Sequence, residues 1–392
     1  MRTLAISSNI AMLAFAASAF TVPPAYVVTD LGTLSGPDTR FEPGTSAAAL
    51  SQSAVVGFSV TTLPKRNFHA FRTIGDVMTD LGVAAPDDEH SMAFSANLAG
   101  DAVGVSYKLG ELSYHGVLWP AAGGLTLLGA MEPGDINNAG AIAGSIPIVN
   151  ALGTTHASLR VGATVTDLGT LGGSSSMGMA LNESNWVVGQ SMLSDGKTTR
   201  AFVRASANMV DLGTLGGSGS RALNIDGLNV VGIADTAAGM PHATLWTLTA
   251  AGALISKTDL STLPGATASA AHGVNASGVV VGTSGDHAFR WSAGTMIDLN
   301  TQIAPGTGWQ LTRAASIDAD GRIAGVGKHY GLQRGFVLTP RAPADFNADG
   351  AVNAADLALL LGAWGTRDLV FDLDGDGVVG AADLGALLGA WG

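Results

Sequence analysis

The sequence contains no cysteine and few charged side chains. Without Cys the protein has no disulfide bonds, no thiolate metal ligands and no thiol catalysis. Charged residues make up 13% of the 392 residues, and the formal net charge is −12. This negative balance argues against nucleic acid and anionic membrane surfaces as partners. Hydrophobic residues make up 47% of the chain, which excludes a disordered protein because disorder requires low hydrophobicity with high charge.

Long hydrophobic runs are also missing. No uninterrupted apolar stretch reaches the roughly 18 residues that a transmembrane helix needs, so we expect no membrane span. The apolar run at 10–20 follows Met1 and Arg2, and Ala17-Ser18-Ala19 has the small-x-small form of a signal peptidase site. This pattern predicts a secretory signal peptide at 1–19 and an extracellular protein that begins at about Phe20.

Glycine, in contrast, is abundant, with 54 residues and no Gly-X-Y period, so a collagen-like chain is excluded. Together with many Val, Thr and Ser residues, this composition indicates short strands joined by tight turns. The predicted fold class is therefore all-β.

Three short motifs recur seven times each. The first is Asp-Leu-Gly or a close variant, which begins at Asp30, Asp80, Leu125, Asp167, Asp211, Asp259 and Asp298. The second is Val-Val-Gly or a close variant, at 55–57, 102–104, 142–144, 187–189, 230–232, 280–282 and 323–325. The third resembles His-Ala-Phe and begins at His69, His115, His156, Arg200, His242, His287 and Arg334. The period of about 44 residues predicts four short strands per repeat, as in the blades of a β-propeller.

The two ends of the repeat array complement each other. The first repeat opens at Tyr26 without a His-Ala-Phe strand, and the last such strand, Gly335–Thr339, has no continuation. A ring whose N- and C-terminal strands pair in one blade explains both ends, because closure removes exposed sheet edges. We therefore predict a closed, seven-bladed propeller over residues 26–340; an open solenoid is the alternative.

These repeats resemble the extracellular HAF repeat family, whose tripeptide is found here at His69–Phe71 and His287–Phe289. The resemblance covers roughly residues 26–340 and implies secretion and a repeat architecture. It implies no activity.

Composition changes at residues 341–392, which hold eight Asp against two Arg, a net charge of −6. Two twelve-residue units, 345–356 and 372–383, account for most of these aspartates. Ca²⁺ prefers six to eight oxygen ligands, and a twelve-residue loop supplies them from positions 1, 3, 5, 7, 9 and 12, with Gly at position 6. The sequence thus predicts two bound Ca²⁺ ions as cofactors, one in each loop. Their ligands would be Asp345, Asn347, Asp349, the Ala351 carbonyl, Asn353 and Asp356, and then Asp372, Asp374, Asp376, the Val378 carbonyl and Asp383.

Each loop leads into a predicted short helix with one apolar stripe, formed by Leu357, Leu360, Leu361 and Trp364 and by Leu384, Leu387, Leu388 and Trp391. A duplicated loop and helix resembles a type I dockerin domain over roughly 344–392. The resemblance implies docking onto a cohesin-like or cell-surface protein through loop positions 10 and 11 and the following helix. Those positions are Ala354-Ala355 and Ala381-Ala382, where cellulosomal dockerins carry hydroxyl or larger side chains.

The in-phase histidines are interpreted as structural, each hydrogen-bonded within its blade, because equivalent residues of successive blades lie too far apart to share a metal ion. We identify no catalytic residue. The sequence predicts a monomeric, non-catalytic binding or scaffold protein whose propeller carries a glycan or protein ligand. The alternatives are a polysaccharide hydrolase or lyase with its site in the propeller, and a structural component of the cell surface. Carboxylates clustered at the channel would favour the enzyme, and the few Glu residues share no position in the repeats.

Overall fold

The computed structural model describes residues 25–35, 45–51, 54–61, 67–75, 77–110, 114–149, 151, 153–347 and 349–392. The chain divides into two compact units: one is Pro24–Arg341, and the other contains Ala342–Gly392. The signal peptide predicted at 1–19 lies outside the described residues.

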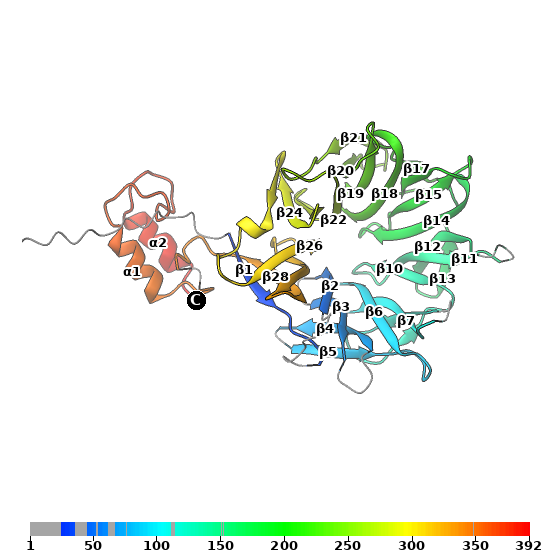
Figure 1. Ribbon diagram of the computed structural model, residues 1–392, viewed down its shortest axis with the longest axis horizontal. Coiled ribbons are helices and arrows are strands. Elements are labelled where there is room, and N and C mark those ends of the chain that lie inside the picture. The colour runs from blue at the N-terminus through cyan, green and yellow to red at the C-terminus, as the bar shows by residue number, and fades with distance from the viewer. Residues whose placement is uncertain are drawn as a thin grey trace, which may run out of the picture. The chain divides into compact units, whose positions relative to one another are not determined.

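The first unit is a seven-bladed β-propeller, as the repeats predict (Figure 1). Each blade is an antiparallel four-stranded sheet. Blades 1 to 3 contain β2 (Thr45–Leu50), β3 (Ala54–Val60), β4 (Phe68–Ile74) and β5 (Val77–Gly82); β6 (His90–Ala96), β7 (Ala102–Tyr107), β8 (Tyr114–Trp119) and β9 (Thr126–Leu127); and β10 (Glu132–Ile136), β11 (Ile142–Pro147), β12 (Thr155–Val161) and β13 (Thr164–Asp167).

The remaining blades follow the same order along the chain. Blades 4 and 5 contain β14 (Gly172–Leu181), β15 (Val187–Leu193), β16 (Thr199–Arg204) and β17 (Val210–Asp211), then β18 (Gly216–Asp226), β19 (Asn229–Thr236), β20 (Pro241–Leu248) and β21 (Leu254–Asp259). Blade 6 contains β22 (Ser269–Val274), β23 (Val280–Ser284), β24 (His287–Ser292) and β25 (Thr295–Asp298), followed by the 3₁₀ turn Leu299–Thr301. Blade 7 contains β26 (Trp309–Ile317), β27 (Ile323–His329), β28 (Leu332–Pro340) and β1 (Tyr26–Asp30).

Blade 7 closes the ring by joining the two ends of the propeller unit, which confirms the predicted closure. β1 pairs antiparallel with β28, from Tyr26 opposite Pro340 to Asp30 opposite Phe336. Tyr26 is buried in the same hydrophobic cluster as Phe336 and Leu338. At the end of β1, the carboxylate of Asp30 lies 2.8 Å from Nδ1 of His329. The closing strand is therefore held by backbone pairing, core packing and a hydrogen bond between Asp30 and His329.

The Val-Val-Gly motif forms part of the second strand of every blade. Close backbone packing explains why its third residue is glycine. In each blade this glycine pairs with the first strand at the residue before a β-bulge, as Gly189 pairs with Gly178. A Cβ on the glycine would overlap a first-strand carbonyl oxygen, that of Met177 in the case of Gly189. The same overlap arises at Gly57, Gly104, Gly144, Gly232, Gly282 and Gly325. The motif thus places two buried residues and then a close backbone approach.

The Asp-Leu-Gly motif forms a turn at the end of the fourth strand. The Asp167 carboxylate accepts a hydrogen bond of 2.8 Å from the Gly169 N–H, and Gly169 has a φ of 74°, which favours glycine. The same carboxylate lies 2.9 Å from Nδ1 of His156 on the third strand. His69–Asp80, His242–Asp259 and His287–Asp298 repeat this pair.

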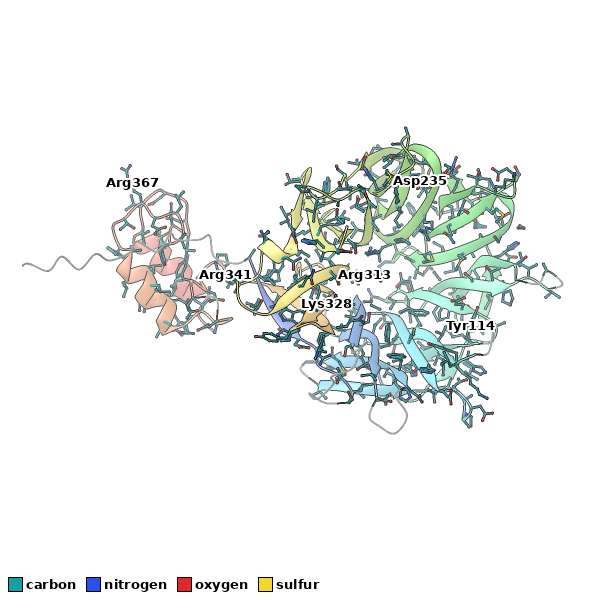
Figure 2. All side chains as sticks on the ribbon, viewed as in Figure 1. Tyr114, Asp235, Arg313, Lys328, Arg341 and Arg367 are labelled. Atoms are coloured by element: carbon teal, nitrogen blue, oxygen red, sulfur yellow. The ribbon has the colours of Figure 1, made fainter. Side chains whose placement is uncertain are left out.

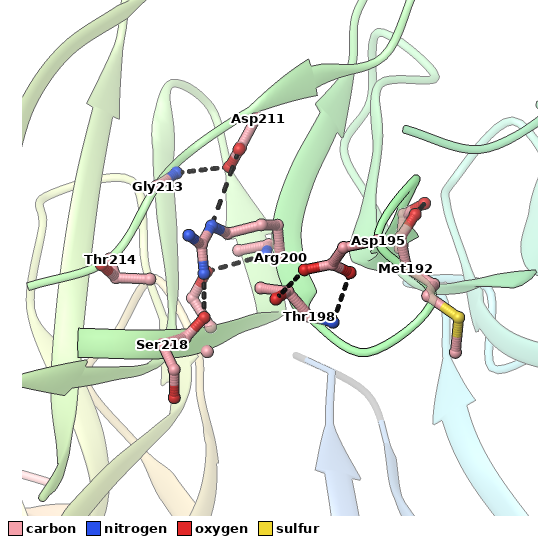
Figure 3. A network of polar contacts seen from close by, with 12 residues as sticks. Met192, Asp195, Thr198, Arg200, Asp211, Gly213, Thr214 and Ser218 are labelled. Atoms are coloured by element: carbon pink, nitrogen blue, oxygen red, sulfur yellow. Dashed lines mark hydrogen bonds and ion pairs between the residues drawn. The ribbon is translucent and has the colours of Figure 1, made fainter. Parts of the chain in front are cut away.

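Three blades depart from the His–Asp pair. In blade 7, Arg334 stands at the histidine position, and Asp30 contacts His329 instead. In blade 4, Arg200 replaces the histidine, and its Nε lies 3.7 Å from the Asp211 carboxylate, which also accepts from the Gly213 N–H (Figure 3). In blade 2, His115 instead contacts Asp88, from the loop before β6, at 3.0 Å. The interpretation of the in-phase histidines as structural residues is confirmed by these contacts.

The His69–Asp80 pair predicts a pH dependence of stability. Burial opposes ionisation of Asp80, but hydrogen bonds from His69 and the Gly82 N–H outweigh it and lower the pKa of this carboxyl below its ordinary 3.8. A lowered folded-state pKa stabilises the fold above the unfolded value, and the contribution is lost as the pH falls through the folded value. We expect Asp80→Asn to cost less than about 1 kcal/mol at neutral pH, because the pair is partly exposed.

Urea unfolding at a series of pH values tests this expectation. The difference between Asp80→Asn and the wild type should shrink towards zero below the ordinary pKa of aspartate. Asp286→Asn is the matched control, since Asp286 is exposed and has no recorded partner among the described residues. A constant difference across the pH range would contradict the role of the carboxylate.

The second unit contains two short helices, α1 (Ala354–Gly362) and α2 (Ala381–Gly389), each of which follows an Asp-rich loop. Its small core contains Phe346, Leu360, Phe371 and Leu387. Its two halves exchange backbone hydrogen bonds: the Gly365 N–H donates to the Val379 carbonyl, and the Gly392 N–H donates to the Val352 carbonyl. The sequence duplication therefore appears as a structural duplication. None of the helices in the described residues is both long and apolar enough to span a membrane.

Candidate functional site

The centre of the propeller is a cavity of about 480 Å³ lined by the first strands of the blades. Each first strand carries the β-bulge opposite the Val-Val-Gly glycine, and a bulge leaves one residue out of the pairing. In all seven blades this extra residue lines the cavity: Ala48, Phe94, Gly134, Met179, Leu223, His272 and Ala315. The bulge thus presents one side-chain position per blade to the channel.

One side of this channel carries nitrogen groups. Arg313 lines it from β26 of blade 7, and His272 lines it from β22 of the adjacent blade 6. Burial and then the positive charge of Arg313 lower the pKa of His272 to about 3, so this imidazole is neutral at ordinary pH. Its Nε2 lies 3.3 Å from the Thr283 hydroxyl. Partial desolvation by the channel walls lowers the pKa of Arg313, which stays exposed to the cavity and has no partner recorded among the described residues.

The other side of the channel carries two carboxylates from blade 3, Asp135 and Glu132. Asp135 accepts hydrogen bonds from the Ser95 hydroxyl at 2.5 Å and from the Leu181 N–H at 3.0 Å. Burial raises the pKa of Asp135 despite these bonds. The Glu132 carboxylate is hydrogen-bonded to Tyr114, whose pKa is raised by burial and by this contact. Both acids are therefore partnered within the protein.

Figure 2 shows Arg313 on the inner side of the ring of blades and Tyr114 farther out. The sequence patterns did not select these channel residues, because Arg313, His272, Glu132 and Asp135 occupy positions that differ in chemistry from blade to blade. The sequence does contain one signal for the channel positions, which is their spacing from the Val-Val-Gly motif. The bulge residue lies nine or ten positions before the Val-Val-Gly glycine, as His272 does before Gly282.

The C-terminal loops bring part of the predicted calcium ligands together. In the first loop, carboxylate oxygens of Asp345, Asp349 and Asp356 lie within 4.8 Å of one another. In the second loop, Asp372, Asp374 and Asp376 do the same. Such clusters of oxygen donors fit a hard divalent cation.

The electrostatics of the second loop support this fit. The Asp376 N–H favours ionisation of Asp374, but partial desolvation and the charges of Asp376 and Asp383 outweigh it and raise the pKa of the exposed Asp374. A cation at this site would relieve that repulsion. In both loops the position-1 carboxylate accepts from the backbone of its own loop, at 3.1 Å from the Gly350 N–H to Asp345 and at 2.9 Å from the Gly377 N–H to Asp372.

The predicted ligands at positions 9 and 12 have other contacts as well. Asn353 accepts from the Ala355 N–H at 2.8 Å and caps α1. Asp356 and Asp383 are buried and accept backbone hydrogen bonds from their own loops, at 2.7 Å from Phe346 and at 2.6 Å from Leu373. Asp356 joins its carboxylate cluster, whereas Asp383 is absent from the second one. The carbonyl ligands predicted at Ala351 and Val378 remain predictions.

The apolar stripe of each helix divides between core and surface. Leu360 and Leu387 are fully buried. One leucine and one tryptophan per helix stay about half exposed, at equivalent positions of the duplication: Leu361 and Trp364, and Leu388 and Trp391. Alanines 354, 355, 381 and 382 are exposed at the starts of the helices.

Comparisons with known proteins show no particular family. No protein-family model and no curated protein matches the sequence. The resemblances to HAF repeats and dockerins therefore stay predictions.

Three solved structures are similar to the chain. A gluconolactonase from Xanthomonas campestris has 12% identity and a TM-score of 0.39, over 81% of this chain and 92% of that one. A puromycin-hydrolysing peptidase from Mycobacterium tuberculosis has 14% identity and a TM-score of 0.47, over 82% of this chain and 55% of that one. An oligogalacturonate lyase from Vibrio parahaemolyticus has 9% identity and a TM-score of 0.33, over 74% of each chain.

These neighbours correct one prediction from the sequence. The sequence analysis predicted that the protein is not an enzyme. The three solved structures are enzymes, which contradicts that prediction. Glu residues that share no position in the repeats do not exclude an active site. Catalytic groups need no such repetition, and Glu132 and Asp135 both line the channel. At these identities the likeness concerns the fold alone, so no particular activity follows.

Proposed function

We propose that this protein is secreted and that its C-terminal unit binds two Ca²⁺ ions and docks it to a cohesin-like or cell-surface protein. The propeller then serves as the platform for a glycan or protein ligand. The predicted signal peptide at 1–19 and the resemblance to HAF repeats support secretion. The resemblance to dockerins supports docking.

The observation that carries the proposal is the duplicated carboxylate cluster. Each loop gathers three carboxylates, and the two loops share position-1 residues with matching backbone contacts. Oxygen ligands at this density suit Ca²⁺ better than softer metals. So small a core gains stability from bound ions, because the binding free energy adds to the folding free energy.

Calorimetric titration of the full chain with Ca²⁺ tests the proposal. We expect two bound ions, one ion in Asp345→Ala or Asp372→Ala, and none in the double variant. Calcium should also increase the helical circular dichroism of the wild type, since each loop leads into a helix. Asp368→Ala is the matched control, because Asp368 lies between the loops and belongs to neither cluster. No heat of binding, or unchanged stoichiometry in the Asp345 and Asp372 variants, would refute the calcium sites.

A second candidate function is a polysaccharide-degrading enzyme with its active site in the propeller channel. The observation that favours it is the meeting of Glu132, Asp135 and His272 at one cavity. Release of reducing ends or unsaturated products from a polysaccharide panel would support it. Activity that survives Asp135→Asn and Glu132→Gln would place the chemistry elsewhere.

A further inference from the structure

Among the residues that the structure describes, Arg313 lines the propeller channel with no recorded protein partner. Asp135 is hydrogen-bonded to Ser95 and Leu181, and Glu132 is bonded to Tyr114. Arg313 has no hydrogen bond or ion pair recorded among the described residues. Arg313 is exposed to the channel, so an anion in the cavity can reach its guanidinium and form charge-assisted hydrogen bonds with it.

The backbone explains why Arg313 reaches the channel. Arg221 occupies the equivalent position in blade 5, since the carbonyls of both residues lie against a Val-Val-Gly glycine. Arg221 does not line the channel. β26 carries an additional register shift between Leu311 and Arg313, directly before the bulge, and β18 is regular from Ser220 to Ala222. The strand that presents the cation thus has a shift directly before its bulge, whereas the second shifts of β14 and β18 lie nearer the starts of those strands.

The surroundings of Arg313 narrow the ligand class. A single guanidinium matches a planar carboxylate with two parallel hydrogen bonds. Two carboxylates across the channel and a net charge of −12 disfavour a multiply charged anion. The neutral His272, Ser95 and Asn224 offer hydrogen bonds to hydroxyl groups, and Phe94 and Met179 offer apolar surface.

We infer that the channel binds a small, singly charged carboxylate with a hydroxylated body, that is, a sugar acid, and that Arg313 holds its carboxylate. The cavity of about 480 Å³ lies within the range of small-molecule sites, roughly 300–1,000 Å³. This inference rests on the platform role proposed for the propeller and names its ligand. It is independent of the calcium sites.

The test is calorimetric titration of the full chain with D-glucuronate and D-galacturonate. We expect binding of at least one of them, no comparable binding of D-glucose, and a loss of affinity of at least about tenfold in Arg313→Met, since charge-assisted hydrogen bonds are lost. Arg221→Met is the matched control and should bind like the wild type. Thermal melts verify folding, and Arg313→Lys replaces Arg313→Met if the latter unfolds, with an intermediate loss expected because the planar fork is gone.

Three outcomes overturn the inference: neither sugar acid binds, glucose binds as tightly, or the Arg313 variants bind like the wild type. Tighter binding of inorganic phosphate than of either sugar acid overturns the choice of a carboxylate. Each of these results leaves the calcium titration unchanged, so a failure here is distinguishable from a failure of the docking unit.

Discussion

Gly189→Ala is expected to lower the free energy of unfolding of the propeller by about 3 kcal/mol or more. A Cβ at this position would overlap the Met177 carbonyl oxygen, and the next nearest atoms also belong to the backbone, of Met177 and Gly178. Backbone atoms cannot rotate away as a side-chain tip can. The two strands must therefore separate, which disturbs the bulge that presents Met179 to the channel.

A glycine of the same blade provides the control for this substitution. Gly196 has a φ of 66° and nothing within 4 Å of an added Cβ. Gly196→Ala should cost only the roughly 1–2 kcal/mol of a left-handed non-glycine residue. Urea unfolding of both variants compares the two costs. A loss at Gly189 no larger than at Gly196 would show that the motif glycine is not selected by close approach.

Removal of the closing strand is the second large perturbation. A chain that begins at Leu31 lacks β1, so β28 becomes an unpaired edge and the core of blade 7 loses Tyr26. Burial of one large side chain contributes about 1.5–3 kcal/mol, and an exposed edge promotes association. We expect a loss of at least about 3 kcal/mol in stability and concentration-dependent aggregation, compared with a chain that begins at Pro24.

A peptide tests whether the strand itself matters. Residues 25–35, added in excess, should restore much of the thermal stability of the shortened chain, because they supply the missing strand and Asp30, the partner of His329. A scrambled peptide of the same composition should restore none. Wild-type stability in the shortened chain would mean that blade 7 does not depend on closure.

The blade number and the closure could be predicted from the sequence because each depends on a repeated motif. Buried Val-Val pairs, Asp-Leu-Gly turns and His-Ala-Phe strands carry their period in the residues themselves. The structure adds that a repeat counted from the His-Ala-Phe strand spans two blades: β4 and β5 are the outer strands of one blade, and β6 and β7 belong to the next.

The channel could not be predicted in the same way. Its lining comes from a backbone irregularity, and the residue left out of the pairing differs from Gly134 to His272 without a shared chemistry. A hydrophobic pattern predicts which residues are buried, but it does not show where a β-bulge inserts an extra residue into a strand. The presence of Arg313 at the channel depends on a register shift directly before the bulge of β26, which no repeat-based comparison would detect.

Because of the bulges, the residues that line the channel can change in evolution independently of the residues that determine the fold. Each blade contributes one unpaired position, and neither the Val-Val-Gly glycine nor the Asp-Leu-Gly turn constrains which side chain stands there. Gene duplication can therefore copy a blade intact while mutation diversifies these seven positions independently. Descendants of one ancestral ring could acquire different specificities without rebuilding any of their folding signals.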